Sequence, residues 1–458
     1  MAELVEAQVS RYHEYKPTGV EWMPEIPVGW EMRKVGHSFH TIGSGTTPNT
    51  DNNLYYRDAE INWINTGDLN DGYLLKTKKK VSKAALEDLS ALKVYPSGSL
   101  IVAMYGATIG KLAITAIEGC ANQACAVLAN SPVFSIRYAF YWFLASKQHI
   151  LTLASGGGQP NINQELIRSL RMPCPTEEEQ EAIASFLDDK TAQLDQLIAQ
   201  KQQMLELLRE EQAALINHAV TKGLDAAAPL RDSGVEWLGE VPAHWEVKKL
   251  KWIAEIQGGI ALSAGKKLEN PIMRPYLRVA NVQDGYLDLA EVKTVEVEAE
   301  QVGRYALHKG DLLMNEGGDN DKLGRGCVWQ GEIEPCLHQN HVFAVRLFNG
   351  YNPEWLNLIT VTEGARTHFM TRAKQSTNLA SISSSNIKEL SVLLPPVAEQ
   401  QKIMALVAEE TARVAEVTAT INQEIGLLQE YRAALIAEAV TGQLDVRNYV
   451  LAQVPVLM

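Results

Sequence analysis

The chain has 458 residues, which at roughly 100–200 residues per domain predicts two to four structural units. Hydrophobic residues make up 46% and charged residues 21%, so a fully disordered chain is excluded. The formal net charge is −13, from 42 basic and 55 acidic residues, which argues against a protein that coats nucleic acid indiscriminately.

The five cysteines are scattered, which excludes a disulfide scaffold. The first residues show neither the basic region nor the apolar stretch of a signal peptide, and no apolar segment is long enough to span a bilayer. We therefore expect a soluble protein with a cytoplasmic location.

The chain contains the same order of segments twice. Residues 18–35 match residues 233–250 at 9 of 18 positions, and residues 176–225 match residues 396–445 at 19 of 50 positions. Shorter matches lie between them: residues 71–74 with 284–287, and Cys120 and Gln123 with Cys336 and Gln339. Because the order is preserved throughout, each half is one unit that contains a globular part followed by a helical part.

Each globular part contains short apolar segments separated by Gly, Asp and Asn turns, which predicts a mixed sheet with some helix. The segments expected as strands are Ile61–Ile64, Ser99–Met104, Cys125–Leu128, Leu312–Met314 and Val342–Leu347. The strand order does not follow from the pattern.

Charge is unevenly distributed. The two helical parts carry net charges of −7 and −5, together −12 of the −13, so the globular parts are nearly neutral. Residues 61–111 hold seven lysines against four acids, and residues 246–281 hold seven basic residues against three acids. Phosphate contacts need positive charge only locally, so both clusters are candidates for DNA contact. A solvated lysine face is the alternative interpretation of each cluster.

The helical parts show apolar residues at heptad spacing, which predicts a coiled coil. Thr176 and Glu179 form a capping-box pattern at the start of the first helix. We expect the two helices to pack antiparallel on each other, the alternative being that each packs on its own globular part. The residues expected to pair the helices are Ile183, Leu187, Leu194, Leu197, Leu208, Leu215, Ile403, Val407, Val414, Val417, Ile421, Leu428 and Leu435. Lys190, Lys201, Met204 and Tyr431 occupy further positions of the same heptad pattern.

The predicted fold class is mixed α/β (α+β), with two globular domains separated by two long antiparallel coiled-coil helices and an internal pseudo-twofold repeat. The expected divisions are residues 1–174 and 226–394 for the globular domains, 175–225 and 395–445 for the helices, and 446–458 for a tail.

Catalytic signatures are missing from the sequence. The segment Gly106–Leu112 is one residue short of a P-loop and lacks the Ser or Thr after Lys111. No Gly-x-Ser-x-Gly motif is present. Cys327, Cys336, His338 and His341 lack the Cys-x-x-Cys spacing of a zinc site, so we expect no metal there.

Several motifs in this order resemble those of the specificity (S) subunits of Type I restriction-modification systems. Each half opens with Gly-Val-Glu-Trp and Glu-x-Pro-x-x-Trp, at residues 19–30 and 234–245. Further motifs are Trp63-Ile-Asn-Thr-Gly-Asp68, Tyr105-Gly-Ala-Thr-Ile-Gly-Lys111 and the Pro-x-x-Glu-Gln start of each helix. The resemblance covers nearly the whole chain, but residues 315–322 replace Tyr-Gly-Ala-Thr in the second half, so the two domains should read different sequences.

The resemblance implies two target-recognition domains, each reading one half of a bipartite, asymmetric DNA target. The helices would set the half-site spacing, and at 1.5 Å per residue each would be roughly 60 Å long. They would also dock two modification subunits, which methylate adenine N6. S-adenosylmethionine, ATP and Mg²⁺ would be used by the modification and restriction/translocase subunits, so we expect no cofactor, no metal and no catalytic residue in this chain.

Side chains suited to phosphate contact and base readout give the candidate DNA-binding residues. In the first domain these are Thr46, Thr47, Asn65, Lys78, Lys79, Tyr105 and Lys111. In the second they are Lys266, Arg278, Asn281, Lys322, Arg325, Gln339, Asn340 and His341. Two other classes stay open at this point. A self-contained methyltransferase or nuclease would need a cofactor motif, and a purely structural coiled-coil scaffold would show no DNA sequence preference.

Overall fold

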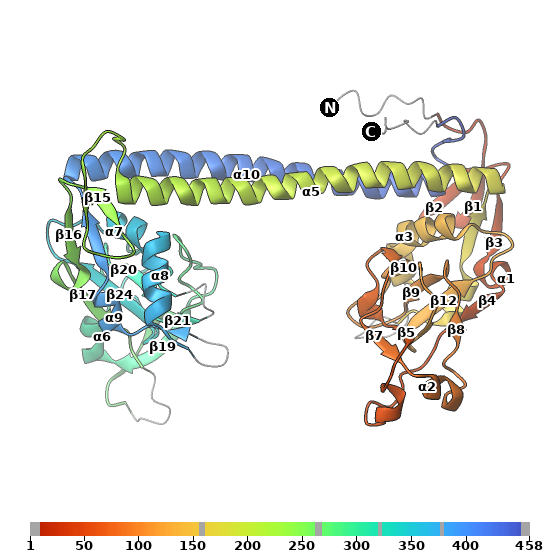
Figure 1. Ribbon diagram of the computed structural model, residues 1–458, viewed down its shortest axis with the longest axis horizontal. Helices are drawn as coiled ribbons and strands as arrows, with labels where there is room; N and C mark the ends of the chain where they lie inside the picture. The colour runs from red at the N-terminus through yellow and green to blue at the C-terminus, as the bar shows by residue number, and fades with distance from the viewer. Residues whose placement is uncertain (1–9, 155–160, 262–267, 319–322, 376–379, 450–458) are drawn as a thin grey trace. The chain divides into compact units, whose positions relative to one another are not determined.

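The computed structural model describes residues 10–154, 161–261, 268–318, 323–375 and 380–449 (Figure 1). The chain forms two compact units, of which unit 1 combines residues up to Lys201 with those from Asn422 onward, and unit 2 is Gln202–Ile421. Each unit holds one globular domain and part of both long helices, α5 (Glu177–Lys222) and α10 (Val397–Val440).

Unit 1 is built on two packed sheets. The first has the strand order β4-β12-β9-β10-β6 and the second β7-β5-β11-β8, with the β6–β10 and β5–β11 pairs parallel and the others antiparallel. Small pairs β1–β2 and β3–β13 join the domain to the helices. The strands are β1 (Tyr15–Val20), β2 (Met23–Pro27), β3 (Glu31–Lys34), β4 (Thr41–Gly43), β5 (Ile61–Ile64), β6 (Gly72–Leu74), β7 (Lys79–Val81), β8 (Val94–Tyr95), β9 (Leu100–Ala103), β10 (Leu112–Thr115), β11 (Gly119–Ala121), β12 (Cys125–Ala129) and β13 (Arg171–Cys174).

Alternation along β9 explains why the two sheets pack as they do. Leu100 and Val102 point toward a core made with helix α3 and both long helices, whereas Ile101 and Ala103 point toward the second sheet. Helix α3 therefore lies between the five-stranded sheet and the long helices (Figure 1). The short helices of unit 1 are α1 (Val35–Ser38), η2 (Asn53–Tyr55), η3 (Thr66–Asp68), α2 (Lys83–Asp88), α3 (Ile136–Thr152) and α4 (Gln164–Ser169).

Unit 2 repeats this arrangement with the sheets β17-β24-β20-β22 and β19-β18-β23, in which β18–β23 is parallel. Its strands are β14 (Leu230–Asp232), β15 (Glu240–Pro242), β16 (Glu246–Lys249), β17 (Ala254–Gly258), β18 (Pro271–Leu277), β19 (Lys293–Glu298), β20 (Leu312–Asn315), β21 (Gly317–Gly318), β22 (Gly326–Val328), β23 (Leu337–His338), β24 (Val342–Leu347), β25 (Lys374–Gln375), β26 (Ala380–Ser381) and β27 (Ser391–Leu394). Its short helices are η4 (Leu250–Trp252), α6 (Ala299–Tyr305), α7 (Pro353–Thr360), α8 (Glu363–Arg372) and α9 (Ser384–Lys388). The mixed α/β class is confirmed, and all five apolar segments predicted as strands contain a strand.

The strand register corrects one equivalence drawn from the sequence. In unit 1 the amide of Cys125 donates to the carbonyl oxygen of Asn122 over 3.3 Å, and in unit 2 the amide of Val342 donates to that of Gln339 over 2.8 Å. Gln339 therefore corresponds to Asn122, one position before the Gln123 with which it aligns by residue type.

The capping box predicted at the start of α5 is confirmed. The amide of Glu179 donates to Thr176 Oγ1 over 3.3 Å, and the amide of Thr176 donates to Glu179 Oε2 over 3.2 Å. Both α5 and α10 lie within the residue ranges predicted for long helices.

Polar contacts between the long helices run antiparallel within each unit. In unit 1 Arg432 binds Asp195 at 2.8 Å and Lys201 binds Glu424 at 2.5 Å, so the partner number falls as the α5 number rises. In unit 2 Gln212 donates to Thr411 over 3.2 Å. No described helix is both long and apolar enough to cross a membrane.

The buried seam of α5 differs by one residue from half of the predicted pattern. Leu187, Leu194, Lys201, Leu208 and Leu215 are buried or half-buried, as predicted. The second line of the seam is Thr191, Ile198 and Leu205, whereas the expected Leu197 is only half-buried and Met204 is 49% exposed. On α10, Ile403, Val407, Val414, Ile421 and Leu435 are buried, Val417 and Leu428 are half-buried, and Tyr431 is exposed.

The corrected seam predicts different effects for two neighbouring side chains. Leu205→Ala should lower the free energy of unfolding by about 2 kcal/mol, because it removes a buried side chain. Met204→Ala should change it by less than about 0.5 kcal/mol, because this side chain is exposed. Urea denaturation followed by far-ultraviolet circular dichroism measures both. A larger loss for Met204→Ala would support the register predicted from the sequence.

Candidate nucleic-acid interface

One short loop of unit 1, between β11 and β12, contacts several of the predicted DNA-binding residues. We call residues 122–124, and the equivalent residues 339–341 of unit 2, the central loops. Asn122 donates from its amide to the carbonyl oxygen of Ile64 over 2.9 Å and from Nδ2 to Asn65 Oδ1 over 3.2 Å. The carbonyl oxygen of Asn122 accepts from the amide of Gly45 over 3.3 Å. The loop therefore connects the segment after β4 with the turn after β5.

Gln123 is the exposed side chain of this loop. Its Oε1 accepts from the backbone amide of Thr47 over 3.2 Å, and its side chain also hydrogen-bonds Tyr105. Burial raises the pKa of Tyr105, so the phenol stays neutral and can donate. A Cβ atom on Gly45 would lie 1.6 Å from the carbonyl oxygen of Ala121, so only glycine allows this close approach.

The turn after β5 holds two more predicted residues. Asp68 accepts from the amide of Asn65 over 2.9 Å and from the amide of Lys78 over 3.2 Å. Lys78 Nζ in turn donates to the carbonyl oxygen of Gly67 over 3.1 Å. The predicted residues that this network brings together are Thr47, Asn65, Lys78 and Tyr105, and Thr46 joins them through its carbonyl oxygen, which accepts from Trp63 Nε1 over 3.3 Å.

Two predicted residues of unit 1 lie at the edges of this network. Lys79 is exposed on β7, where it pairs in register with Trp63. Lys111 follows the β9–β10 turn, and its side chain forms no hydrogen bond or ion pair with any described residue. Both ammonium groups are therefore available to bind DNA phosphates.

The central loop of unit 2 presents different side chains. Asn340 is half-buried, with Nδ2 3.4 Å from His341 Nε2. His341 is exposed, and its Nδ1 lies 2.7 Å from Glu316 Oε2. Glu316 occupies the position that Met104 has in unit 1, since each amide donates to the same residue of its central loop. The loops are thus equivalent in backbone and different in chemistry.

Asn281 does not have the role expected from the sequence. It is 3% exposed, its Oδ1 accepts from the amide of Arg278, and its Nδ2 donates to the carbonyl oxygens of Asp288 and Glu291, each over 2.9 Å. It is the counterpart of Asp68, which accepts from the amide of Asn65 in the same way. We therefore assign Asn281 to shaping the turn, because its side-chain donor and acceptor atoms already have partners within the domain.

The other predicted residues of unit 2 have mixed settings. Arg278 is half-buried, with its guanidinium 3.7 Å from Glu291. Arg325 is half-buried and has interactions within the domain. Gln339 donates from its amide to the carbonyl oxygen of Leu277 over 2.9 Å, and it is half-buried. Lys266 and Lys322 lie outside the described residues.

The two basic clusters also differ. Lys76 and Lys79 of unit 1 are exposed and form no ion pair with a described residue. In unit 2, Lys248 binds Glu246 and Lys251 binds Glu389, both at 2.7 Å. Among the described residues, carboxylates therefore pair with Lys248, Lys251 and Arg278 of the second cluster, whereas in the first cluster Lys83 pairs with Glu60.

Sequence reasoning missed Gln123, Asn122 and Glu316. Gln123 had a usable signal, because it belongs to a short match between the halves and carries an amide that suits base readout. Glu316 had no comparable signal, since only the fold brings it to His341.

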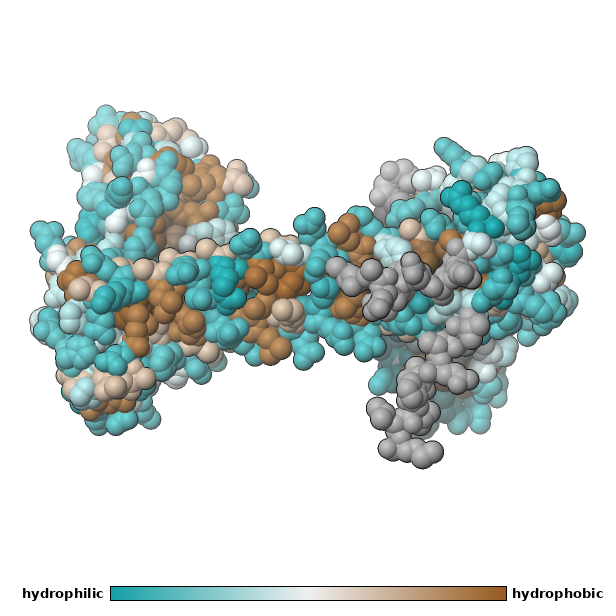
Figure 2. Space-filling model, turned by 90° about the horizontal axis from the view of Figure 1, so that it is seen from above, coloured by the Kyte–Doolittle hydropathy of each residue, from teal (hydrophilic) through white to brown (hydrophobic). Residues whose placement is uncertain are grey.

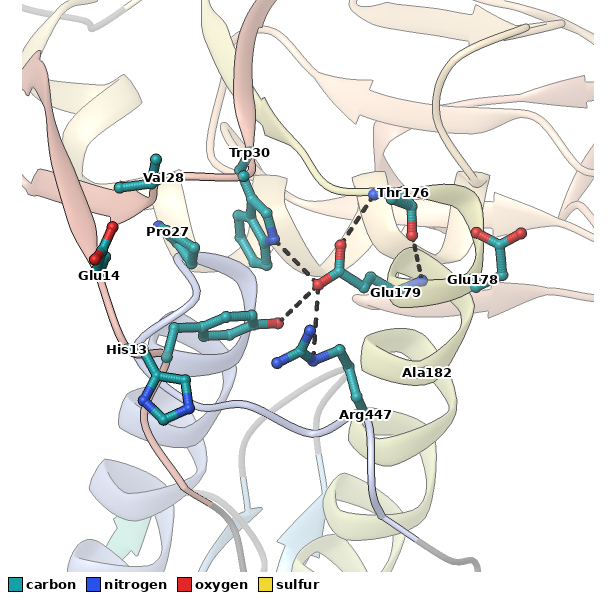
Figure 3. Close-up of a pocket in the computed structure, with 12 residues that line it drawn as sticks. His13, Glu14, Pro27, Val28, Trp30, Thr176, Glu178, Glu179, Ala182 and Arg447 are labelled. Carbon is teal, nitrogen blue, oxygen red and sulfur yellow. Dashed lines mark hydrogen bonds and ion pairs between the residues drawn. The ribbon is translucent and has the colours of Figure 1, made fainter.

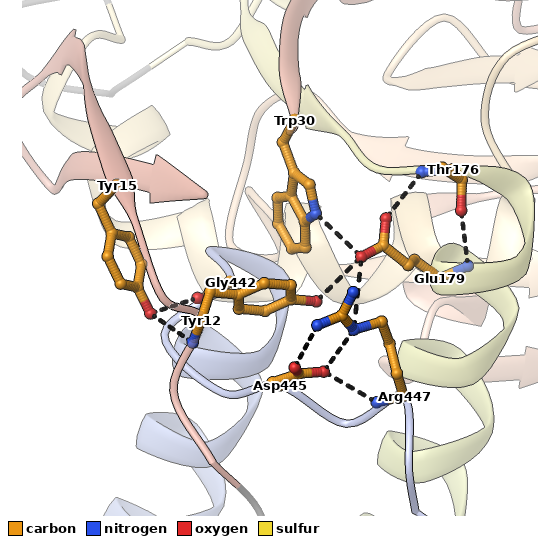
Figure 4. A network of polar contacts seen from close by, with 8 residues as sticks. All are labelled: Tyr12, Tyr15, Trp30, Thr176, Glu179, Gly442, Asp445 and Arg447. Carbon is orange, nitrogen blue, oxygen red and sulfur yellow. Dashed lines mark hydrogen bonds and ion pairs between the residues drawn. The ribbon is translucent and has the colours of Figure 1, made fainter. Parts of the chain in front are cut away.

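A cavity of about 670 Å³ at the start of α5 is an alternative site (Figure 3). At its centre Glu179 Oε1 accepts from the Tyr12 hydroxyl over 3.3 Å and from Trp30 Nε1 over 3.5 Å, and it lies 4.0 Å from Arg447 Nε (Figure 4). Burial, with the charge of Glu179, raises the pKa of Tyr12, which keeps the phenol a donor. Arg447 is also paired with Asp445. Because these groups satisfy one another, the cavity is a structural joint.

A metal site in the described part of the chain would need a cluster of ligating side chains. No group of three or more His, Cys, Asp or Glu side chains there is placed to hold a metal ion. Burial raises the pKa of both Cys327 and Cys336 to about 12, so both thiols stay protonated in the metal-free chain.

Comparison with known proteins identifies the family. The chain matches the family model for the Type I restriction modification DNA specificity domain twice, over residues 27–207 and 242–427. The chain belongs to this family. Its members are the non-catalytic specificity subunits of Type I restriction-modification systems. The two matched regions span the two globular domains and most of both long helices.

Individual relatives agree with the family match. The Type I restriction enzyme EcoKI specificity subunit of Escherichia coli (strain K12) is 24% identical over 436 residues, covering 92% of this chain and 90% of the relative. A structure from a study of complex assembly and conformational transition of the type I R-M system has a TM-score of 0.69 at 15% identity, covering 91% of this chain and 99% of the other. The crystal structure of the HsdS subunit from Thermoanaerobacter tengcongensis has a TM-score of 0.50 at 14% identity, covering 91% and 98%. These structures share the fold.

The assignment of Asn281 to the turn predicts a stability effect. Asn281→Ala should lower the free energy of unfolding by about 2 kcal/mol, because buried groups lose their hydrogen bonds. Asn340→Ala, on the central loop, should leave stability nearly unchanged and serves as the matched control. Thermal unfolding of the two variants measures this. Equal melting temperatures for the Asn281 variant and the wild type would contradict the assignment.

Proposed function

We propose that this chain directs a Type I restriction-modification complex to a bipartite, asymmetric DNA target, with each globular domain reading one half-site. The observation that carries the proposal is the pair of central loops. They share three backbone hydrogen bonds, yet they present Gln123 in one unit and Asn340 with His341 in the other. One fold with two sets of polar side chains suits a protein that reads two different half-sites.

The chemistry of these side chains suits base readout. Amide side chains such as those of Gln123 and Asn340 can donate to and accept from adenine in the major groove. Gln123 would exchange its hydrogen bonds with Thr47 and Tyr105 for bonds to a base, which its exposed position allows. His341 with Glu316 offers a donor or an acceptor, depending on which imidazole nitrogen carries the proton. Lysines such as Lys79 and Lys111, with no described ion-pair partner, can position the phosphate backbone in the first domain.

The long helices support docking of two modification subunits. Identical exposed residues recur at equivalent positions of α5 and α10, and at 3.6 residues per turn they fall on one face of each helix, opposite the buried seam. We call this face the shared stripe. It consists of Ala192, Ala199, Gln203, Leu207, Glu210 and Ala214 on α5, and of Ala412, Ala419, Gln423, Leu427, Glu430 and Ala434 on α10.

The shared stripe has the character of an interface. Leu207 is 56% exposed and Leu427 57% exposed, and Figure 2 shows apolar side chains gathered on the exposed surface of the helices. A partner that binds one stripe can bind the other in the same way, which suits two identical subunits. In this proposal S-adenosylmethionine, ATP and Mg²⁺ belong to the partner subunits. The helices act as the spacer between the half-sites.

Base readout by the central loop predicts a sequence-specific loss. Gln123→Ala should weaken binding of the assembled complex to its target about tenfold or more and relax specificity at one base pair of one half-site. Gln429→Ala, an exposed glutamine on α10, is the matched control and should bind like the wild type. Fluorescence anisotropy and methylome sequencing measure affinity and motif. An unchanged motif at full affinity would remove Gln123 from the reading residues.

Docking on the shared stripe predicts the loss of partner subunits. Leu207→Glu and Leu427→Glu should each weaken the binding of one of the two modification subunits about tenfold or more, because the substitution places a charge in an apolar contact. Leu54→Glu changes a leucine that is 64% exposed outside the stripe, and this control should assemble normally. Native mass spectrometry counts the subunits. Complete assembly of both stripe variants would place the docking surface elsewhere.

A further inference from the structure

Both halves present an exposed tyrosine on the same four-residue sequence, Asp-Gly-Tyr-Leu. Tyr73 is 51% exposed and Tyr286 is 61% exposed, and neither hydroxyl has a hydrogen-bond partner among the described residues. The leucine that follows packs inward in each half, since Leu74 is 4% exposed and Leu287 contacts the core of its domain. We call residues 71–74 and 284–287 the tyrosine turns.

Each tyrosine turn has an ion pair from its aspartate to a helix, although the backbone register differs by one residue: the amide of Asp71 donates to the carbonyl oxygen of Leu112 in unit 1, and that of Gly285 donates to the carbonyl oxygen of Gly326 in unit 2. Asp71 lies 3.7 Å from Lys147 of α3, and Asp284 lies 2.6 Å from Arg366 of α8. The two basic residues correspond, because each precedes by two positions a histidine that packs on an equivalent tryptophan. These ring pairs are Trp22–His149, with centroids 6.0 Å apart, and Trp237–His368, with centroids 6.4 Å apart. The ion pair to the aspartate is therefore present in both units, although the basic residue is lysine in one and arginine in the other.

The surroundings of the two turns differ in charge. Tyr73 is followed by Lys76 and Lys78, whereas Tyr286 is followed by Asp288 and Glu291. A DNA phosphate would be attracted more strongly at the first turn than at the second, where Arg278 and Lys293 lie 3.7 and 3.9 Å from Glu291. A base contact is also disfavoured, because the central loops present different side chains and an identical tyrosine cannot distinguish two half-sites. The shared tyrosine therefore suits a ligand that is the same for both halves and is not DNA.

A cavity in unit 1 connects its tyrosine turn with the shared stripe. It has a volume of about 390 Å³, and its lining includes Tyr73, Arg137, Asp188 and Ala192. Ala192 is the first residue of the shared stripe on α5. A protein that covers this part of the stripe would therefore reach Tyr73 without a gap.

We propose that the tyrosine turns are a second docking contact for the modification subunits, in which Tyr73 binds one copy and Tyr286 the other. This inference rests on the function proposed above and adds a contact on the globular domains to the one on the helices. The partner surface should offer an apolar recess for the ring and a hydrogen-bond acceptor for the free hydroxyl, a combination that suits tyrosine at interfaces.

The test compares full-length variants assembled with their own modification subunit. Tyr73→Ser and Tyr286→Ser should each weaken the binding of one of the two modification subunits about tenfold. The double variant should weaken the binding of both. Leu54→Ser and Met273→Ser are matched controls, because these side chains are 64% and 54% exposed and lie outside the tyrosine turns. Native mass spectrometry over a concentration series gives the affinities, and thermal unfolding checks that each variant is folded.

The outcomes separate this inference from the proposed function. Normal assembly of the tyrosine variants with weakened DNA binding would make the turns a DNA contact and would overturn the inference. Normal assembly with normal DNA binding would overturn it as well, but would leave the proposed function intact. Failure of the wild-type chain to bind any modification subunit would overturn both.

Discussion

Each globular domain contacts the start of a long helix through one glutamate at the third helix position, beside the apolar core that domain and helices share. Glu179 caps α5 with one oxygen atom and holds Tyr12, Trp30 and Arg447 with the other. In unit 2, Glu399 has the same place and binds His244 at 2.8 Å. Because the Glu179 carboxylate has partners in both the helix start and the domain, it contributes, with the shared apolar core, to the orientation of the first domain on its helix. The position of each central loop relative to its own part of the helices follows from this joint.

Much of the fold could be predicted because the sequence contains an internal repeat. The repeated segments predicted two similar domains, and short apolar segments between Gly, Asp and Asn turns predicted strands such as β9 and β24. The seam of α5 shows where periodicity fails. Leu197 stands next to Ile198, Met204 next to Leu205 and Leu207 next to Leu208, so two apolar lines one residue apart fit the same spacing. Packing against α10 selects one of them, and the sequence of α5 alone does not contain that choice.

The candidate interface was less predictable, because residue type does not reveal whether a polar side chain is already used. Asn281 and Asn340 are both asparagines in the second domain, but the first has its hydrogen bonds taken up within a turn and the second lies on the central loop. The lysines show the same limit, since Lys79 is free while Lys251 is neutralised by Glu389. These differences arise from partners distant in sequence, such as the 138 positions between Lys251 and Glu389.

The meeting of the two chain ends in unit 1 determines when that unit can be completed during synthesis. The amide of Asp445 donates to the carbonyl oxygen of Ser10 over 2.7 Å, and the core of the first domain includes Leu435, Ala439 and Val446. Unit 2 is one continuous stretch, Gln202–Ile421, and can fold while later residues are still being translated. The first domain keeps part of its apolar core uncovered until Leu435, Ala439 and Val446 have been translated.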